Sequence, residues 1–385
     1  MQPLPADPNM TRHEVIQVEL GERGYPIHVV AGGLDELGST LARQVDPGRV
    51  VLVTNPVVAE FHQKPAVDAL ERAGFEVVIL HIPDGESHKH LQTWAALVEQ
   101  LLNARIDRRT LVLALGGGVT GDVVGFAAAS VLRGVPFVQV PTTLLAMVDA
   151  SVGGKTGFNT THGKNLVGAF YQPRLVYAAT DVLDTLPQAE WRCGLGEALK
   201  HGVIRDIELV DWMDANAQAL RSRDPSASSW LVRRCCEIKS EVVAADEREA
   251  GLRAILNFGH TAGHALETAL GHGSLRHGEA VALGMLAETR LAVERGWCRE
   301  PGMFSRLEQL SERLELPTTL PAGPLTKLGS SFRDKLDHAV RMDKKTVRGR
   351  LNLVVPIGMG SAELHTATAD DLVALMDLTE SWEKS

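Results

Sequence analysis

The first half of this 385-residue chain alternates short runs of apolar residues with longer helical patterns. The runs are rich in Val, Leu and Ile, which is typical of strands buried on both faces of a parallel sheet. Parallel neighbours need crossover connections, so the helical stretches are expected to cover that sheet. The expected strands are residues 15–20, 27–31, 50–54, 77–82, 111–115, 137–140 and 175–177, with helices that include 59–73 and 91–104.

The pattern changes at about Pro187, after which long helical periodicities dominate. Only residues 351–355 have the character of a strand there. The sequence therefore predicts an α/β, Rossmann-like domain over residues 1–186 and a mainly α-helical domain over 187–385, in keeping with the chain's length. The expected helices of the second domain are 190–203, 226–249, 260–270, 277–296, 304–314 and 332–342.

Charge and cysteine usage exclude several classes of partner and compartment. The formal net charge of −9 argues against a nucleic-acid or anionic-membrane surface, although a few focused lysines still suit a small anionic substrate. No apolar run approaches the ~18 residues of a membrane span, and the N-terminus lacks the apolar core of a signal peptide. The four cysteines form no C-x-x-C pair, so buried thiols in a reducing, cytoplasmic setting are expected.

A glycine-rich turn follows the expected strand 111–115. Gly116, Gly118 and Gly121 fit the spacing G-x-G-x-x-G between a strand and a helix, where backbone N–H groups can approach a pyrophosphate. A tight turn with close helix–strand packing explains the same glycines, and both interpretations stay open. A second glycine-rich segment, at 154–156, is not a P-loop, because Asp149 occupies the position of that motif's first glycine.

A possible metal site is spread over three helical segments. His260 and His264 are four residues apart and share one face of a helix, while His277 opens the next helix. Glu197 lies upstream in a stretch of small and apolar residues. Two histidines and one carboxylate can bind Zn²⁺ and leave a position open. Among 14 histidines a chance pair at helical spacing is common, so spacing alone slightly favours histidines with a structural role.

Cationic residues recur beside glycines or in apolar segments, which is unusual for a solvated charged face. Lysines on glycine loops are suited to binding anions as point charges. The alternative is a set of ordinary surface lysines, and it weakens as the number of such positions grows. The positions are Lys155, Lys164, Lys200, Lys239, Arg253, Lys344 and Lys345.

Together these segments resemble the 3-dehydroquinate synthase family of sugar-phosphate cyclases. They occur in the order expected for the family from about residue 80 to residue 358. Two departures are Ala150, where serine is frequent, and Arg276, where leucine often precedes the histidine. The matching segments are 84–89, 116–122, 141–156, 163–165, 196–200, 246–249, 251–264, 277–279 and 343–345.

The resemblance implies a dehydroquinate synthase-like fold, bound NAD and one divalent metal, Zn²⁺ or Co²⁺. Glu197, His260 and His277 are the implied metal ligands. The residues implied to hold NAD are Asp84, Gly85, Glu86, Ser87, His88, Lys89, Gly118, Val119, Thr120, Gly121, Asp122, Thr142, Thr143, Lys155, Lys164, Val182, Leu183, Asp184 and Thr185.

The implied substrate is a small anionic sugar phosphate, 3-deoxy-D-arabino-heptulosonate 7-phosphate. A phosphorus–oxygen lyase of this family converts it to 3-dehydroquinate and phosphate in the shikimate pathway. The reaction involves transient oxidation by NAD, phosphate elimination, reduction and an aldol closure. The residues implied to surround the substrate are Asp149, Lys155, Asn165, Lys200, Lys239, Arg253, Asn257, His264 and one of Lys344 or Lys345.

Two implied roles extend beyond simple binding. His264 is the candidate for proton relay, because a neutral imidazole accepts a proton near pH 7. Family members are commonly homodimers in which an arginine matching Arg133 reaches the partner's site.

Three other functions are compatible with parts of this pattern. An iron-type alcohol or glycerol dehydrogenase shares the two-domain layout but would not need cations for a phosphate and a carboxylate. Another sugar-phosphate cyclase would be expected to change the positions that face the carboxylate, whereas Lys239, Arg253 and Asn257 retain the dehydroquinate type. A non-catalytic nucleotide-binding protein would be expected to have lost the metal-ligating residues.

Overall fold

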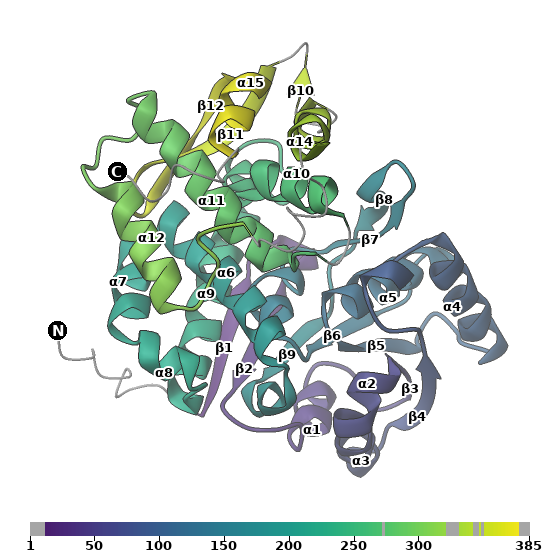
Figure 1. The fold of residues 1–385 in the computed structure, drawn as a ribbon. Coiled ribbons are helices and arrows are strands. Elements are labelled where there is room, and N and C mark those ends of the chain that lie inside the picture. The colour runs from purple at the N-terminus through teal and green to yellow at the C-terminus, as the bar shows by residue number, and fades with distance from the viewer. Residues whose placement is uncertain (1–11, 272–273, 321–330, 342–345, 348–349, 377–385) are drawn as a thin grey trace. The chain divides into compact units, whose positions relative to one another are not determined.

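The computed structural model describes residues 12–271, 274–320, 331–341, 346–347 and 350–376 (Figure 1). Contacts divide the chain into two compact units, and each is described separately. The sheet unit comprises residues 6–187 and 225–248. The helical unit comprises the described residues within 188–224 and 249–376.

A seven-stranded sheet forms the core of the sheet unit, in the order β1-β2-β9-β6-β5-β3-β4. β1 pairs with β2 in antiparallel fashion, and every other neighbouring pair is parallel. All residues of β2, β5, β6 and β9 are buried, which explains why they are mostly apolar, with His28 and Gln139 as polar exceptions. The strands are β1 (His13–Val18), β2 (Tyr25–Val30), β3 (Arg49–Thr54), β4 (Glu76–His81), β5 (Leu111–Gly116), β6 (Phe137–Pro141) and β9 (Leu175–Ala179).

Helices connect the parallel strands and pack on the sheet, as the sequence predicts. Apolar side chains of α4 and α5, including Leu97 and Val123, form one core with Val51 and Val112 from β3 and β5. The helical elements are η1 (Gly21–Arg23), α1 (Leu37–Ala42), α2 (Pro56–Val58), η2 (Ala59–Gln63), α3 (Lys64–Arg72), η3 (Glu86–His88), α4 (Leu91–Asn103), α5 (Gly118–Ser130), η4 (Val131–Arg133), η5 (Ala146–Ala150), η6 (Thr180–Thr185) and α9 (Pro225–Ala245).

Helix α9 lies in the second half of the sequence but belongs to the sheet unit by its contacts. It packs against β1, β2 and the π-helical turn η5. The predicted division at residue 187 assigns α9 to the helical domain, because the division follows the change of periodicity along the chain. Contacts group α9 differently because its buried face, which includes Val232 and Cys236, covers the antiparallel edge of the sheet.

A hairpin of β7 (Lys155–Thr160) and β8 (Gly163–Phe170) was not predicted. Its strands contain glycines and polar residues rather than an apolar alternation, so periodicity gives no signal. The ring of Phe158 anchors the hairpin to α4 and α5, with centroids 6.0 Å from Trp94 and 5.7 Å from Phe126. The strand that begins at Lys155 also agrees with the rejection of a P-loop, which requires a helix there.

Apart from α9, the long helices expected after Pro187 lie in the helical unit, together with a small sheet. The sheet has the order β10-β11-β12, with antiparallel pairs, and only its central strand was predicted. The described elements of the helical unit are α6 (Gln188–Arg205), α7 (Ile207–Ala215), α8 (Ala217–Arg221), η7 (Leu252–Asn257), α10 (His260–Leu270), α11 (His277–Glu294), α12 (Met303–Arg313), α14 (Ser331–Arg341), β10 (Thr346–Val347), β11 (Arg350–Gly358), β12 (Ser361–Thr368) and α15 (Ala369–Met376).

The cysteines largely follow the expectation of buried thiols. Cys193, Cys235 and Cys236 are buried, and Cys298 is only partly so. Burial raises the pKa of the Cys193 and Cys236 thiols to about 12, which keeps both protonated and unreactive. None of the helices in the described part of the chain combines the length and the apolar character that a membrane span requires.

Candidate active site

Three side chains of the helical unit direct donor atoms toward one another. Glu197 lies on α6, whereas His260 and His277 are the first residues of α10 and α11. The Nε2 atom of His260 lies 3.6 Å from Oε1 of Glu197, and Nε2 of His277 lies 3.4 Å from the same oxygen. One carboxylate and two imidazoles form a set that binds a divalent ion such as Zn²⁺ and leaves a coordination position open.

Close backbone contact at two glycines fixes the spacing of these donors. A Cβ atom on Gly278 would lie 2.0 Å from the carbonyl oxygen of Cys193, and one on Gly196 would lie 2.5 Å from the carbonyl oxygen of Gly278. Only glycine permits this approach of α6 to the start of α11. Gly196 precedes Glu197 and Gly278 follows His277, so the glycines bring the carboxylate and one imidazole together.

The hydrogen bond of His260 assigns its tautomer. Its Nδ1 atom lies 3.1 Å from the carbonyl oxygen of Phe258, so Nδ1–H donates there and the lone pair of Nε2 faces Glu197. Metal-binding histidines commonly donate their second N–H to a carbonyl or carboxylate in this way. Burial lowers the pKa of His260 well below its ordinary value, which favours the neutral, metal-binding form.

The carboxylate of Glu197 is fully buried and lies beside a buried cation. The Nζ atom of Lys200, one turn further along α6, lies 2.5 Å from Oε2 of Glu197. This contact directs the other oxygen, Oε1, toward the histidines. Burial alone would lower the pKa of His277, but the neighbouring carboxylates of Glu197 and Glu267 outweigh it and raise that pKa to about 9. A divalent ion would have to displace this proton.

A second donor set overlaps the first and includes Glu267, which the sequence analysis missed. Glu267, His264 and His277 also have donor atoms close enough to share an ion. The Nδ1 atom of His277 lies 3.8 Å from Oε2 of Glu267, and the ring of His264 stacks on that of His277 at 5.8 Å. The signal for Glu267 is its position three residues after His264, on the same helix face. The set with Glu197 is the stronger candidate because both of its histidine Nε2 atoms face one fully buried oxygen.

In the sheet unit, the residues predicted to bind NAD, apart from Lys155 and Lys164 on the β7–β8 hairpin, follow the carboxyl ends of four parallel strands. Residues 84–89 follow β4, residues 118–122 begin α5 after β5, Thr142 and Thr143 follow β6, and residues 182–185 form part of η6 after β9. The carboxyl edge of a parallel sheet is where open α/β folds bind ligands. The N-cap of α5 is Gly117, which has no side chain that could occupy the first-turn N–H groups.

A polar network links two of these segments to the β7–β8 hairpin. The buried Nζ atom of Lys89 lies 2.5 Å from Oδ2 of Asp122 and 2.6 Å from Oδ1 of Asn165. Desolvation would lower the pKa of Lys89, but the charge of Asp122 outweighs it and keeps the lysine protonated. Asn159 extends the network, because its Nδ2–H donates to Glu86 and its Oδ1 accepts from the backbone N–H of Asn165. The network joins the 84–89 loop, α5 and the β7–β8 hairpin.

The remaining predicted substrate residues are divided between the units. Lys239 is buried on α9 and donates to the backbone carbonyl of Asp149 at 2.5 Å and to its Oδ1 at 2.8 Å. Arg253 is almost fully buried on η7 of the helical unit, and the Nδ2–H of Asn257 donates to Glu249 at 2.6 Å. Lys155 is exposed at the start of β7 and Lys164 is half-buried on β8. Lys344 and Lys345 lie outside the described residues.

Comparison with known proteins assigns the family. The model described as 3-dehydroquinate synthase N-terminal matches residues 79–193, and the C-terminal model matches residues 194–346. A 3-dehydroquinate synthase of Citrifermentans bemidjiense is 46% identical, with 95% of this chain and 98% of that protein covered. A chloroplastic one of Arabidopsis thaliana is 44% identical, with 93% and 80% covered. The chain belongs to the 3-dehydroquinate synthase family.

Two solved structures extend this comparison within the wider group of cyclases. A 2-deoxy-scyllo-inosose synthase complexed with carbaglucose-6-phosphate, NAD⁺ and Co²⁺ has a TM-score of 0.81 at 25% identity, with 94% of this chain and 99% of that chain covered. A 2-epi-5-epi-valiolone synthase from Streptomyces hygroscopicus with NAD⁺ and Zn²⁺ bound has a TM-score of 0.81 at 29% identity, with 91% and 95% covered. The architecture is therefore that of the dehydroquinate synthase-like cyclases, as the sequence analysis predicted.

The two departures from the family pattern leave the geometry of the candidate site intact. Arg276 directly precedes His277 and forms an ion pair with Glu190 at 2.8 Å on the surface. It is the N-cap residue of α11, and its backbone N–H donates to Oε2 of Glu279 at 3.1 Å. Ala150 ends the turn η5, where its Cβ lies 3.3 Å from the position of a Cβ on Gly118. A small residue at 150 therefore suits the close approach of η5 to α5.

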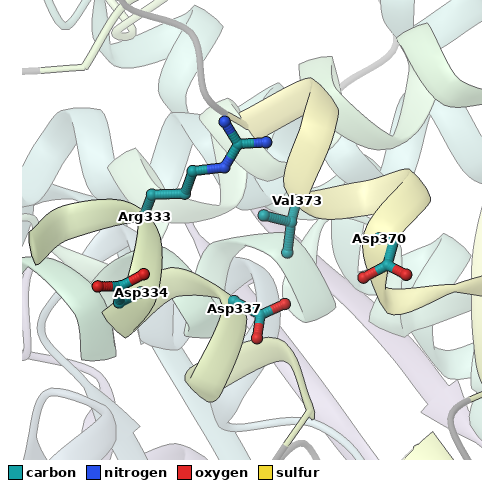
Figure 2. Close-up of a pocket in the computed structure, with 5 residues that line it drawn as sticks. All are labelled: Arg333, Asp334, Asp337, Asp370 and Val373. Atoms are coloured by element: carbon teal, nitrogen blue, oxygen red, sulfur yellow. The ribbon is translucent and has the colours of Figure 1, made fainter. Parts of the chain in front are cut away.

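A hollow of about 300 Å³ has none of these residues in its lining (Figure 2). Its lining comes from α14 and α15 and consists of Arg333, Asp334, Asp337, Asp370 and Val373. The carboxylates of Asp337 and Asp370 already form ion pairs with Arg341. An acidic hollow is unsuited to a phosphorylated or carboxylated ligand, so we assign it no role in the chemistry of the family.

The close packing at Gly278 leads to a testable prediction. In G278A the new Cβ would meet backbone atoms of Cys193, so the start of α11 must shift and carry His277 away from Glu197. We expect a loss of on the order of 1 to 3 kcal/mol in the free energy of unfolding of the metal-free protein. We also expect weaker Co²⁺ binding, measured by titration of the visible absorption bands. The matched control is G33A, since a Cβ at Gly33 would meet no atom within 4 Å. Co²⁺ binding by G278A as tight as that of the unmodified protein would contradict this account.

Proposed function

We propose that this chain is a 3-dehydroquinate synthase. It converts 3-deoxy-D-arabino-heptulosonate 7-phosphate to 3-dehydroquinate and phosphate, as a phosphorus–oxygen lyase dependent on NAD and one divalent metal. The observation that carries the proposal is the convergence of Glu197, His260 and His277 in a chain that is 43–46% identical to several 3-dehydroquinate synthases over nearly its full length. The cyclases with other products are only 25–29% identical.

The side chains present fit both bound groups. The neutral tautomer of His260 and the buried oxygen of Glu197 suit Zn²⁺ or Co²⁺. The uncapped start of α5 and the carboxyl edge of the sheet suit a dinucleotide. When bound, NAD accepts and returns a hydride at C5 of the substrate, and the metal stabilises negative charge on the C5 oxygen.

The protein's own residues would then handle protons and charge. His264 is our candidate to accept the proton of the C5 hydroxyl, because its ring lies beside those of His260 and His277. Oxidation at C5 acidifies the neighbouring C6 hydrogen, so that phosphate can leave by elimination. After reduction at C5, ring opening and an intramolecular aldol reaction give the carbocycle.

The cationic residues have a separate proposed task. Lys155, Lys239 and Arg253 would bind the phosphate and carboxylate of the substrate and hold reactive intermediates in place. Lys200 would also fix Glu197, since its ammonium already lies 2.5 Å from that carboxylate. Asp149, Asn165, Asn257 and one of Lys344 or Lys345 would complete the substrate set.

We further propose a homodimer in which Arg133 reaches the partner's site. Arg133 is exposed and lies in a left-handed stretch, with φ of 50° at Leu132, 65° at Arg133 and 115° at Gly134. Such conformations are costly for non-glycine residues and are often kept for function. A cytoplasmic location is also our proposal, supported by the buried thiols.

An activity measurement distinguishes this proposal from a dehydrogenase of similar fold. We expect phosphate release from 3-deoxy-D-arabino-heptulosonate 7-phosphate in step with 3-dehydroquinate formation. The NADH absorbance at about 340 nm should show no net rise, because the hydride returns to the product. A chelator should abolish phosphate release and added Zn²⁺ or Co²⁺ should restore it. Stoichiometric NADH without phosphate would instead indicate an alcohol dehydrogenase.

Two histidine variants separate metal binding from proton transfer. H260A should lose the bound metal and the metal-dependent turnover. We expect its metal affinity to fall by more than about 10- to 100-fold, which is the loss typical of removing a residue that only hydrogen-bonds to a ligand. H264N should retain the metal and lose at least about tenfold in kcat, because it lacks only the proposed proton acceptor. Metal content by atomic absorption and steady-state rates distinguish the two. Loss of metal in H264N would mean that the ion occupies the alternative set with Glu267.

A further inference from the structure

Glu288 is a fully buried acid in the apolar middle of α11, and the proposed chemistry does not use it. Its Oε2 atom accepts a hydrogen bond from the backbone N–H of Gly259 at 2.7 Å. Its Oε1 atom accepts from the backbone N–H of Ala262 at 3.1 Å. Gly259 is the N-cap of α10, which begins at His260, and Ala262 lies in its first turn. The side chain of one helix therefore caps the start of another.

This arrangement replaces a cap that α10 cannot supply itself. The first four N–H groups of a helix have no partner within it, and a side chain at the N-cap usually binds one of them. The N-cap of α10 is Gly259, which has no side chain and adopts φ of 77°. A Cβ there would lie 2.7 Å from the carbonyl oxygen of Val281, so glycine is needed for α10 to approach α11. Glu288 supplies the missing acceptors, and its charge suits the positive end of the helix dipole.

Glu288 binds one backbone N–H before His260 in the sequence and one after it. The N–H of Gly259 precedes this residue directly, and the N–H of Ala262 follows two residues later. Between these fixed amides, the imidazole donates through Nδ1 to Phe258 and directs Nε2 at Glu197. A shift of this turn would move Nε2 relative to the carboxylate on α6.

We propose that Glu288 is a positioning residue for the metal centre, which holds the first turn of α10 so that the Nε2 atom of His260 faces Glu197. The inference rests on the proposed function, because it assumes that His260 binds the ion. Glu288 itself has no part in coordination, since both of its oxygens are engaged by backbone N–H groups. It acts through the backbone that carries the ligand.

The variant E288Q tests this proposal with little change in volume. The glutamine amide oxygen can replace one of the two carboxylate oxygens and keep that hydrogen bond. Its NH₂ group takes the place of the other oxygen and faces a backbone N–H, and two donors cannot form a hydrogen bond. We expect the affinity of the metal-free protein for Co²⁺, measured by calorimetry, to fall by about 10- to 100-fold. The matched control is E294Q on the same helix, where Glu294 is half-exposed and paired with Arg290 at 3.2 Å. E294Q should bind Co²⁺ like the unmodified protein.

The possible outcomes separate this proposal from the proposed function. If the unmodified protein binds no Co²⁺ or Zn²⁺, the proposed function fails. If it binds the ion and folded E288Q binds it equally well, Glu288 is only a structural cap, even if Tm falls, and the positioning proposal is wrong. The shorter acid in E288D should restore the charge but not the geometry, so its Co²⁺ affinity should also be weakened.

A measurement on the unmodified protein covers the case in which neither variant folds. First-turn amides of a helix normally exchange quickly with solvent, whereas those of Gly259 and Ala262 should be protected in the metal-free protein. Rapid hydrogen exchange at both amides would overturn the proposal.

Discussion

The buried contact between Glu197 and Lys200 is the interaction on which the organisation of the helical unit depends. Both side chains are essentially inaccessible to solvent, and charges are buried only at considerable cost unless they are compensated. The lysine engages one carboxylate oxygen, which leaves the other to face two imidazoles. An apolar pair of similar volume would serve stability at least as well. The arrangement is therefore explained by what it can bind rather than by what it adds to folding.

Backbone packing makes this contact possible. The glycines at 196, 278 and 284 let α6, α10 and α11 approach at backbone distance, so that ligands from three helices meet without long loops. Secondary partners then fix each donor. Lys200 holds Glu197, the carbonyl of Phe258 holds His260, and Glu267 faces His277. In the sheet unit, side-chain hydrogen bonds fix the candidate site instead. Lys89 binds Asp122 at the start of α5 and Asn165 of the β7–β8 hairpin.

Much of this architecture could be predicted from the sequence because its signals are local. Parallel strands buried on both faces have continuous apolar runs, and all seven strands of the large sheet were expected. The β7–β8 hairpin and β12 were not, because glycine-rich and half-exposed strands lack such runs. The assignment of α9 to the sheet unit depends on contacts between residues far apart in sequence, which periodicity does not encode.

The candidate site was predicted to a similar extent. Glu197, His260 and His277 were identified through the family pattern, and the structure brings them together; their roles remain proposals. Glu267 and Glu288 were missed, although each is an acid buried among apolar neighbours, which is the signal that singled out Glu197. The distinction between a ligand and a cap requires three-dimensional contacts.

The central claim is that one divalent ion binds to Oε1 of Glu197 and to Nε2 of both His260 and His277. X-ray absorption spectroscopy of the Zn²⁺-loaded protein tests this coordination directly. The account predicts only nitrogen and oxygen neighbours at about 2.0–2.2 Å, with the outer-shell pattern of two imidazoles. A sulfur neighbour at about 2.3 Å, which would point to the nearby thiol of Cys193, or a spectrum without imidazole, would contradict it.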